Sequence, residues 1–259
     1  MGLKYHQPTF DLLKQEPVMF PLASTWLENF EAEIGQRLPP SVREWYAIEG
    51  AHDILAAHSN SDHPIPLKDL GAKHKLEAVL RIDSLSTVSL LKIMVENQGV
   101  CIWAVKLDDS EDPPVFVKLE ERGGTWQDAA DHFSEFIYSW VWDYSLHDFS
   151  VELVARPLSP EDKAYLHLHF GELFATAKWP RCTEYRYSRR GQKIRIRSGE
   201  RQADWLISAS SADSFYELGH ILWSGTKLPF WQGVIFGIDD ESEVQTVTER
   251  LRKELWQKP

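Results

Sequence analysis

The feature that most constrains the fold is a pair of apolar segments joined by a short turn, within residues 89–107. In the first segment Leu91, Ile93 and Val95 occupy alternate positions, which is the period of a strand with one buried face. Asn97-Gln98-Gly99 follows, and glycine supplies the positive φ that hairpin turns need. Residues 100–107 are almost continuously apolar, as in a central strand covered on both faces. The sequence therefore predicts an antiparallel hairpin inside a sheet.

Helical patterns surround this hairpin. Residues 24–35 and 41–49 carry apolar side chains at helical spacing, and Pro40 suits the first turn of the second helix. Gly50 is expected to end that helix, and residues 126–144 are expected to form one long amphipathic helix. Strands and helices in this irregular order predict an α+β fold with a mixed or antiparallel sheet flanked by helices.

A second module is expected after a pair of prolines, Pro157 and Pro160, which interrupt the pattern. We predict one domain over residues 20–150 and an α+β C-terminal module or extension over residues 157–259. Its segments read as helices at 159–174, 214–223 and 241–256 and strands at 183–188, 193–198, 205–208 and 233–238.

Charge is distributed unevenly between the two modules. Residues 1–150 contain 12 Lys and Arg against 24 Asp and Glu, a net charge of −12, whereas residues 151–259 contain 16 against 15. A field of this sign repels nucleic acid and attracts basic proteins within about 10 Å at cellular salt. The sequence therefore favours a basic protein partner and makes nucleic acid an unfavourable one.

The expected compartment is the cytoplasm. No apolar run approaches the roughly 20 residues that a membrane helix needs, and the first residues do not form an apolar signal segment. Cys101 and Cys182 are far apart in the sequence and make no disulfide framework. We expect no association with a membrane.

No motif for a known chemistry is present. The sequence lacks a glycine-rich phosphate loop, a Walker lysine, an HExxH pair, a CxxC pair and a Gly-x-Ser-x-Gly elbow. Cys182 follows Arg181, which is expected to lower its pKa modestly, but no base accompanies it. We therefore predict no catalytic residue, no metal site and no cofactor, and the protein is not expected to be an enzyme.

Two charged segments are candidates for recognition. Residues 108–112 form an acidic turn, with carboxylates at Asp108, Asp109, Glu111 and Asp112. Such a turn is either a solvated loop or a patch that steers a basic partner and competes with nucleic acid for it.

Residues 181–201 are the strongest basic feature, and apolar residues alternate with their charges. A hairpin here would bury one face and show a basic one. The basic face is either an anion contact or a solvated surface that docks on acidic residues. The candidate anion contacts are Arg186, Lys193, Arg195 and Arg197.

The first module resembles the SUKH superfamily, which includes fungal cell-wall-assembly regulators and many bacterial immunity proteins. The resemblance spans about residues 20–145. Its opening is the stretch at 30–46, with Gly35, Leu38-Pro39 and the aromatic pair Trp45-Tyr46, followed by Gly50; the family usually has Asn before this glycine, where this chain has Glu49. Further matching pieces are Glu96-Asn97-Gln98-Gly99 with Trp103, Asp112-Pro113-Pro114-Val115, Trp126 and the helix around 133–136.

The resemblance implies an α+β binding protein with no catalytic residues. Its leading implication is a cytoplasmic immunity protein that neutralises a cognate toxin, often a nuclease, by covering the toxin's active site. Trp103 would serve as an aromatic anchor if it were exposed, and otherwise belongs to the core. The expected partner contacts are Glu49, Asp53, Trp103, Asp108, Asp109, Glu111 and Asp112.

Other functions stay open at this point. A regulatory scaffold, as in the fungal branch, would have several partners. A small-molecule binding protein or enzyme would hold an anionic group at the basic hairpin within 181–201. Fold alone does not decide between these classes.

Overall fold

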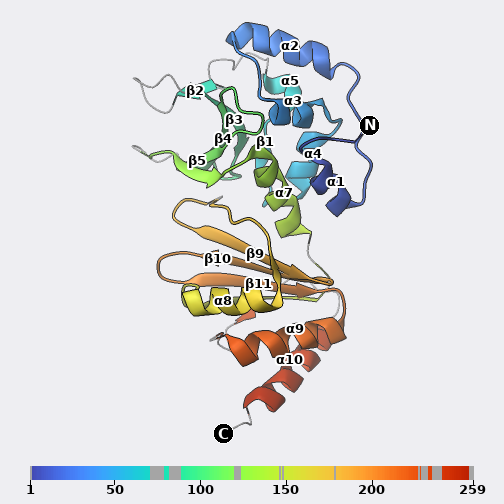
Figure 1. Cartoon of the computed structure of the whole chain (residues 1–259), viewed down its shortest axis with the longest axis vertical. Coiled ribbons are helices and arrows are strands. Elements are labelled where there is room, and N and C mark those ends of the chain that lie inside the picture. Colours follow the sequence, from blue (N-terminus) through green and yellow to red (C-terminus); the bar gives the residue numbers. More distant parts are fainter. Residues whose placement is uncertain are drawn as a thin grey trace. The chain divides into compact units, whose positions relative to one another are not determined.

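The computed structural model describes residues 2–70, 79–81, 89–119, 124–145, 147, 149–177, 179–226, 228, 233–234 and 241–256. Contacts divide the chain into two compact units (Figure 1). Unit 1 comprises Met1–Ser145 and Thr176–Pro180, and unit 2 comprises Leu146–Ala175 and Arg181–Pro259. The predicted boundaries, 20–150 and 157–259, differ from this division. Residues 1–19 and Thr176–Pro180 belong to unit 1, and residues 146–156 belong to unit 2.

Unit 1 is built on an antiparallel sheet of six strands. The order is β1-β3-β4-β5-β6, and β2 also pairs with β3. This sheet with its helices confirms the predicted α+β fold. The strands are β1 (His63–Pro64), β2 (Val79–Arg81), β3 (Ser89–Val95), β4 (Cys101–Leu107), β5 (Val115–Leu119) and β6 (Gln127–Ala130).

The predicted hairpin is confirmed as β3 and β4, which pair from Ser89 opposite Leu107 to Val95 opposite Ile102. Gly99 in the turn has φ +73°, a conformation that only glycine adopts without strain. Every residue of β4 is buried except Lys106, which is half-buried. The continuous apolar pattern therefore correctly indicated a central strand.

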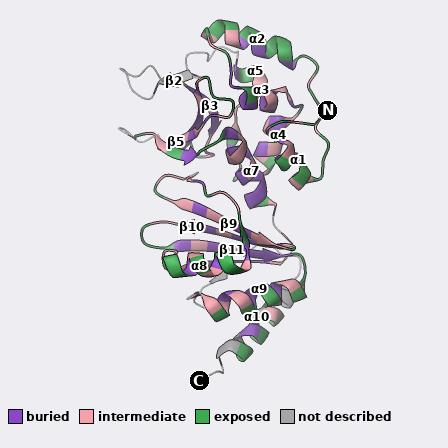
Figure 2. Ribbon diagram, viewed as in Figure 1, coloured by how far each residue is buried: buried purple, intermediate pink, exposed green. Residues whose placement is uncertain are grey.

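Helices pack on this sheet, and together they enclose one apolar core (Figure 2). The long helix α7 crosses the core with Phe133, Phe136, Ile137 and Trp140 fully buried. The helices of unit 1 are α1 (Gln7–Leu13), α2 (Ala23–Ile34), α3 (Pro40–Ala47), α4 (Ala51–Ala57), α5 (Leu67–Leu70) and α7 (Phe133–Tyr144).

Two of the predicted helices, at 24–35 and 41–49, are confirmed as α2 and α3, and Pro40 is the first residue of α3. Gly50 has the left-handed backbone, with φ +70°, but it precedes α4 as its N-cap. The helix before it, α3, already ends at Ala47, and Ile48 is its C-cap with an extended backbone. The prediction that Gly50 ends the helix was therefore wrong, because the sequence pattern did not reveal α4.

The long helix expected at 126–144 is also shorter than predicted. Its first part is the strand β6, whose Gln127 and Ala130 pair with Val117 and Val115 of β5. The helix begins only at Phe133. Pairing with β5, an earlier strand, outweighs the local helical pattern.

The segment before α2 adds a short antiparallel contact to unit 1. Met19 forms a bridge opposite Ile48. The Phe20 amide donates to the Ala47 carbonyl at 2.8 Å, and the Glu49 amide donates to the Val18 carbonyl at 2.8 Å. These bonds hold the N-terminal segment to the junction between α3 and α4.

Unit 1 is completed by residues from much later in the chain. The Ala177 amide donates to the Ala129 carbonyl of β6 at 2.7 Å. The Trp179 ring lies 5.3 Å from the Trp103 ring and 6.4 Å from the Trp140 ring. Thr176–Pro180 therefore lies along the last strand of the sheet and contributes an aromatic ring to the core.

Unit 2 contains a second antiparallel sheet of six strands, in the order β12-β7-β11-β10-β9-β8. The sequence did not predict β7, which pairs with β11 over seven residues. The strands are β7 (Phe149–Ala155), β8 (Gly171–Glu172), β9 (Thr183–Arg189), β10 (Gln192–Ser198), β11 (Ala203–Ala209) and β12 (Gly233–Val234).

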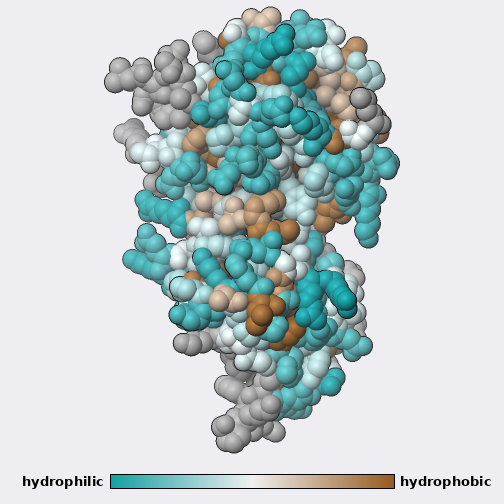
Figure 3. Space-filling view, in the orientation of Figure 1, coloured by the Kyte–Doolittle hydropathy of each residue, from teal (hydrophilic) through white to brown (hydrophobic). Residues whose placement is uncertain are grey.

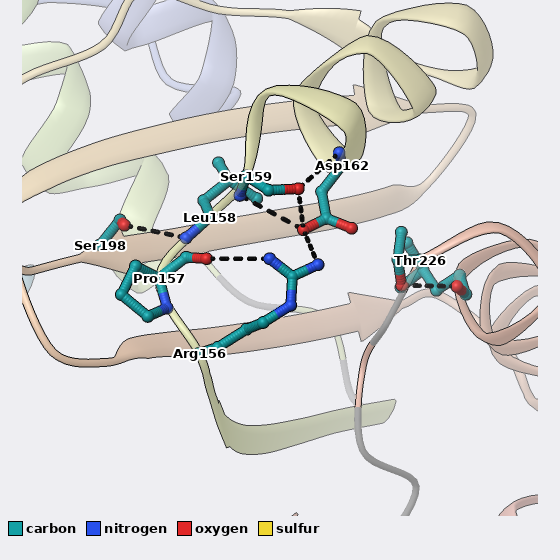
Figure 4. Close-up of polar contacts among 8 residues, drawn as sticks. Arg156, Pro157, Leu158, Ser159, Asp162, Ser198 and Thr226 are labelled. Atoms are coloured by element: carbon teal, nitrogen blue, oxygen red, sulfur yellow. Dashed lines mark hydrogen bonds and ion pairs between the residues drawn. The ribbon is translucent and has the colours of Figure 1, made fainter.

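One face of this sheet is apolar and packs with helices α8 (Pro160–His169) and α9 (Ala212–Gly225). The helix α10 (Glu241–Trp256) lies against α9 (Figure 1). Ser159 and Asp162 form the capping box that starts α8, and Arg156 binds the same carboxylate at 2.7 Å (Figure 4). The predicted helices at 214–223 and 241–256 are confirmed as α9 and α10. The helix predicted at 159–174 is shorter, because α8 ends at His169 and residues 171–172 form β8, which pairs with β9. Of the strand expected at 233–238, residues 235–238 lie outside the described part.

Candidate functional site

The acidic turn connects β4 to β5, and its first two carboxylates lie at the surface. Asp108 Oδ1 accepts a hydrogen bond from the Ser110 amide at 3.0 Å, and Asp108 Oδ2 lies 3.0 Å from Lys106 Nζ. Partial burial acts to raise the pKa of Asp108, but these hydrogen bonds outweigh it and hold the pKa below its usual value. Asp109 is exposed. The turn thus presents two carboxylates at the surface, next to a backbone that Asp108 holds in place.

These two residues border a surface hollow of about 440 Å³, which we call the acidic hollow. Its other walls come from α2, α3 and the loop between them. Four carboxylates and two guanidinium groups line it, so its formal charge is −2. The lining residues are Glu28, Glu31, Arg37, Leu38, Pro39, Pro40, Arg43, Asp108, Asp109 and Ser110.

Some of these charges are engaged within the chain. Arg43 Nη1 lies 2.5 Å from Glu31 Oε2, and Glu31 Oε1 accepts from the Leu38 amide at 2.8 Å. Glu28 and Asp109 are exposed. The Glu31 contacts fix the wall of the hollow, while Glu28 and Asp109 present negative charge to solvent.

The other two carboxylates of the turn bind their own chain. Glu111 pairs with Lys4 at 2.7 Å, which lowers the pKa of Glu111 below its usual value. Asp112 Oδ1 accepts from the Ser134 amide at 3.0 Å, and its Oδ2 accepts from the Ser134 hydroxyl. Because Ser134 lies in the first turn of α7 and the N-cap His132 makes no side-chain cap bond, Asp112 caps this helix from outside. Glu111 and Asp112 thus have structural contacts.

Glu49 and Asp53 lie at a different place from the acidic hollow. Both are exposed, at the junction of α3 and α4. Glu49 lines a separate hollow with Phe20 and Trp26. Asp53 Oδ1 lies 3.2 Å from His52 Nε2. The residues predicted as one contact set therefore divide between two parts of the unit 1 surface.

Trp103 belongs to the core. It is 0% exposed, and its ring packs edge-on against the Trp140 ring at 5.5 Å. The condition for an aromatic anchor, exposure of Trp103, is not met, because β4 is the central strand of the sheet and this side chain points to α7.

The four basic residues proposed as anion contacts lie on one face of the β9–β10 hairpin, as the alternation predicted. Arg195 is opposite Arg186 and Lys193 is opposite Ser188, whereas Ile194 and Ile196 face the apolar core. Gly191, with φ +76°, forms the predicted turn.

A carboxylate of the same hairpin lies among these cations. Glu184 Oε2 is 3.0 Å from Arg186 Nη2, and Glu184 Oε1 is 3.0 Å from Arg197 Nε. Arg186 and Glu184 are both 0% exposed. The expectation of a solvent-exposed basic face was therefore wrong for Arg186 and also for Lys193, which is buried. An external anion would have to compete with Glu184 for two of the four cations.

Neither cysteine has the properties of a reactive thiol. Burial raises the pKa of Cys101 to about 12. Partial burial also raises the pKa of Cys182 above its usual value, although Arg197 acts in the opposite direction. The lowered pKa expected for Cys182 was therefore wrong, because desolvation of the thiolate outweighs the nearby positive charge.

Sequence reasoning missed most of the acidic hollow. The sequence analysis did not predict Glu28, Glu31, Arg37 or Arg43 as site residues. The only signal that brings them near one another is the break at Leu38-Pro39-Pro40, where the chain turns from one helix to the next. Within the described ranges, no three His, Cys, Asp or Glu residues are grouped as a metal site would require. None of the described helices is both long and apolar enough to span a bilayer.

Comparison with known proteins gives no relative from which a role could be transferred. No family model, no curated protein and no solved structure matches the chain.

Proposed function

We propose that the chain is a non-enzymatic protein-binding protein of the SUKH type, and that it acts as a bacterial immunity protein. Its partner would be a basic cognate toxin, such as a nuclease, whose active site it covers. The observation that carries this proposal is the acidic hollow, whose lining includes the exposed carboxylates Glu28 and Asp109 and the apolar residues Leu38 and Pro39. A basic side chain of the partner would enter between the two carboxylates.

Charge supports this choice of partner. The hollow lies within residues 1–150, which contain 24 Asp and Glu against 12 Lys and Arg. Complementary fields accelerate association and exclude partners of the wrong sign. Nucleic acid, which is itself an anion, is an unfavourable ligand for such a surface.

The alternative of an anion-binding protein is less well supported. Glu184 already pairs with Arg186 and Arg197, and removing a cation from a buried carboxylate is costly.

A cytoplasmic location is part of the proposal, because Cys101 and Cys182 are both free thiols and reducing compartments maintain this state.

The test is co-expression in a bacterial host with the product of the gene next to this chain's own. We expect that product to inhibit growth alone and the chain to restore growth and bind it. The double variant Glu28→Lys/Asp109→Lys should lower the affinity at least tenfold, about 1.4 kcal/mol, because both exposed charges are reversed.

The matched control is Glu16→Lys/Glu200→Lys, which changes the net charge equally at exposed positions outside the hollow and should leave binding within twofold. A neighbouring product that neither inhibits growth nor binds the chain contradicts the immunity function. Binding of several unrelated proteins without any toxin would instead favour a regulatory scaffold.

A further inference from the structure

The N-terminal part of unit 1 carries a cluster of exposed apolar side chains. Among the residues whose exposure the structure describes, eight large apolar side chains are exposed, and four of them lie within residues 18–26. They are Val18 at 59%, Met19 at 50%, Leu22 at 55% and Trp26 at 39%. Figure 3 shows a brown and tan patch beside the right-hand end of α2. Single exposed apolar residues are ordinary, but a contiguous group marks an interaction surface.

Two adjoining hollows open beside this cluster, and we call them together the Trp26 groove. They share Trp26, Leu67 and Lys68 and have volumes of about 220 and 270 Å³. Since a water molecule occupies about 30 Å³ of liquid, each can take a large side chain in place of several waters. The remaining lining residues are Phe20, Tyr46, Ile48, Glu49, Gly50, His52 and Pro66 in the first hollow and Asn29, Phe30 and Glu33 in the second.

The backbone beside the groove offers one position for strand pairing, at Met19, because Pro17 and Pro21 on either side of it have no N–H. Met19 is opposite Ile48 in the bridge, and the hydrogen bonds run from the residues on either side of this pair. In an antiparallel ladder, the amide and carbonyl of such a non-hydrogen-bonded residue point away from the partner strand. The Met19 N–H and C=O are therefore directed outward, where an extended chain can pair with them.

Charge specifies the occupant further. The groove is bordered by the exposed carboxylates Glu33 and Glu49 and by a single lysine, Lys68, in the strongly acidic part of the chain. An acidic or neutral polar segment gains little from this border, whereas a segment that alternates apolar and basic residues gains both apolar burial and ion pairs.

We propose that the Trp26 groove binds an extended segment of the partner protein, which pairs as a strand with Met19 and alternates apolar with basic side chains. The apolar side chains contact Trp26 and Phe20, whose rings lie 5.3 Å apart, and a basic one approaches Glu49. This inference rests on the proposed protein-binding function and gives it a second contact, separate from the acidic hollow.

The test uses the full chain and a dye-labelled peptide of nine residues that alternates lysine and leucine, with binding followed by fluorescence anisotropy. We expect Trp26→Ser to weaken binding at least tenfold. The control Leu168→Ser, which removes an exposed apolar side chain of unit 2 (77% exposed), should leave binding within twofold. A peptide with glutamate in place of lysine should bind at least tenfold more weakly.

Strand pairing is tested by methylating the peptide amides at every second residue, in each of the two registers. Methyl groups on the amides that face Met19 prevent the strand from pairing, whereas methyl groups on the other amides do not. We therefore expect the affinities of the two peptides to differ at least tenfold. Equal binding of the two registers, or unchanged binding by Trp26→Ser, would overturn the proposal.

Two further outcomes separate this inference from the proposed function. If Glu28→Lys/Asp109→Lys abolishes peptide binding while Trp26→Ser has no effect, the peptide occupies the acidic hollow; the groove proposal then fails and the protein-binding function stands. If the chain elutes as a dimer that Trp26→Ser converts to a monomer, the occupant is a second copy and the proposal is again overturned.

Discussion

The acidic turn of unit 1 and the basic hairpin of unit 2 carry charge of opposite sign and use it differently. In the turn, Asp109 is exposed and Asp108 borders the acidic hollow. In the hairpin, Glu184 lies between Arg186 and Arg197 and pairs with both. A run of like charges in a sequence therefore does not show whether those charges are available to a partner, because one carboxylate placed within it can neutralise its centre.

The largest expected effect concerns the hairpin. Glu184→Gln should destabilise the protein by about 3 kcal/mol, because it breaks the buried ion pair between Glu184 and Arg186. Urea unfolding measures this change. Arg197→Gln is the matched control; its side chain is 32% exposed, so it should cost clearly less. Equal losses in the two variants would show that Arg186 does not depend on Glu184.

The second comparison lies within the acidic turn. Asp112→Ala should cost about 1–2 kcal/mol, because the amide and hydroxyl of Ser134 lose their acceptor at the start of α7. Asp109→Ala, three residues earlier and exposed, should change stability by less than about 0.5 kcal/mol. Thermal unfolding of both variants decides this. A destabilising Asp109→Ala would mean that this carboxylate also has a structural role.

The smallest expected effect is a pH dependence at Asp108. Its pKa is lower in the folded chain than its ordinary value of 3.8, so its contribution to stability is present above that value and is lost as the pH falls through the folded pKa. Since the pair with Lys106 is partly solvated, the contribution is below about 0.5 kcal/mol. Asp108→Asn should therefore reduce stability slightly at pH 6, and this reduction should become smaller as the pH is lowered below 3.8, as measured by urea unfolding.

Local signals in the sequence predicted local structure well. The β3–β4 hairpin, the start of α3 at Pro40 and the capping box at Ser159 each depend on residues within a few positions of one another. The pairing that turned residues 127–130 into a strand depends on β5, and the helical pattern there was misleading. Tertiary pairing decides such cases, and a single sequence does not display it.

The two candidate sites differ in how far they were predictable. The acidic hollow joins Glu31 to Arg43 and the 38–40 loop to the turn at 108–110, and no sequence pattern places these segments together. The neutralisation of the basic hairpin was visible in principle. With the turn at Arg190-Gly191, an antiparallel register places Glu184 opposite Arg197 and on the same face as Arg186. Both ion pairs could therefore have been predicted from the residue positions in the hairpin.

The return of Thr176–Pro180 to unit 1 has a consequence for biosynthesis. A ribosome that has released the first 145 residues has supplied all six strands of the first sheet, but not Ala177, which pairs with β6, or Trp179, which packs on Trp103 and Trp140. Until translation passes residue 180, this nascent sheet keeps an open edge and an incomplete aromatic core. Unpaired edges invite association with other chains, so the growing polypeptide stays open to aggregation and to chaperones until this segment has been synthesised.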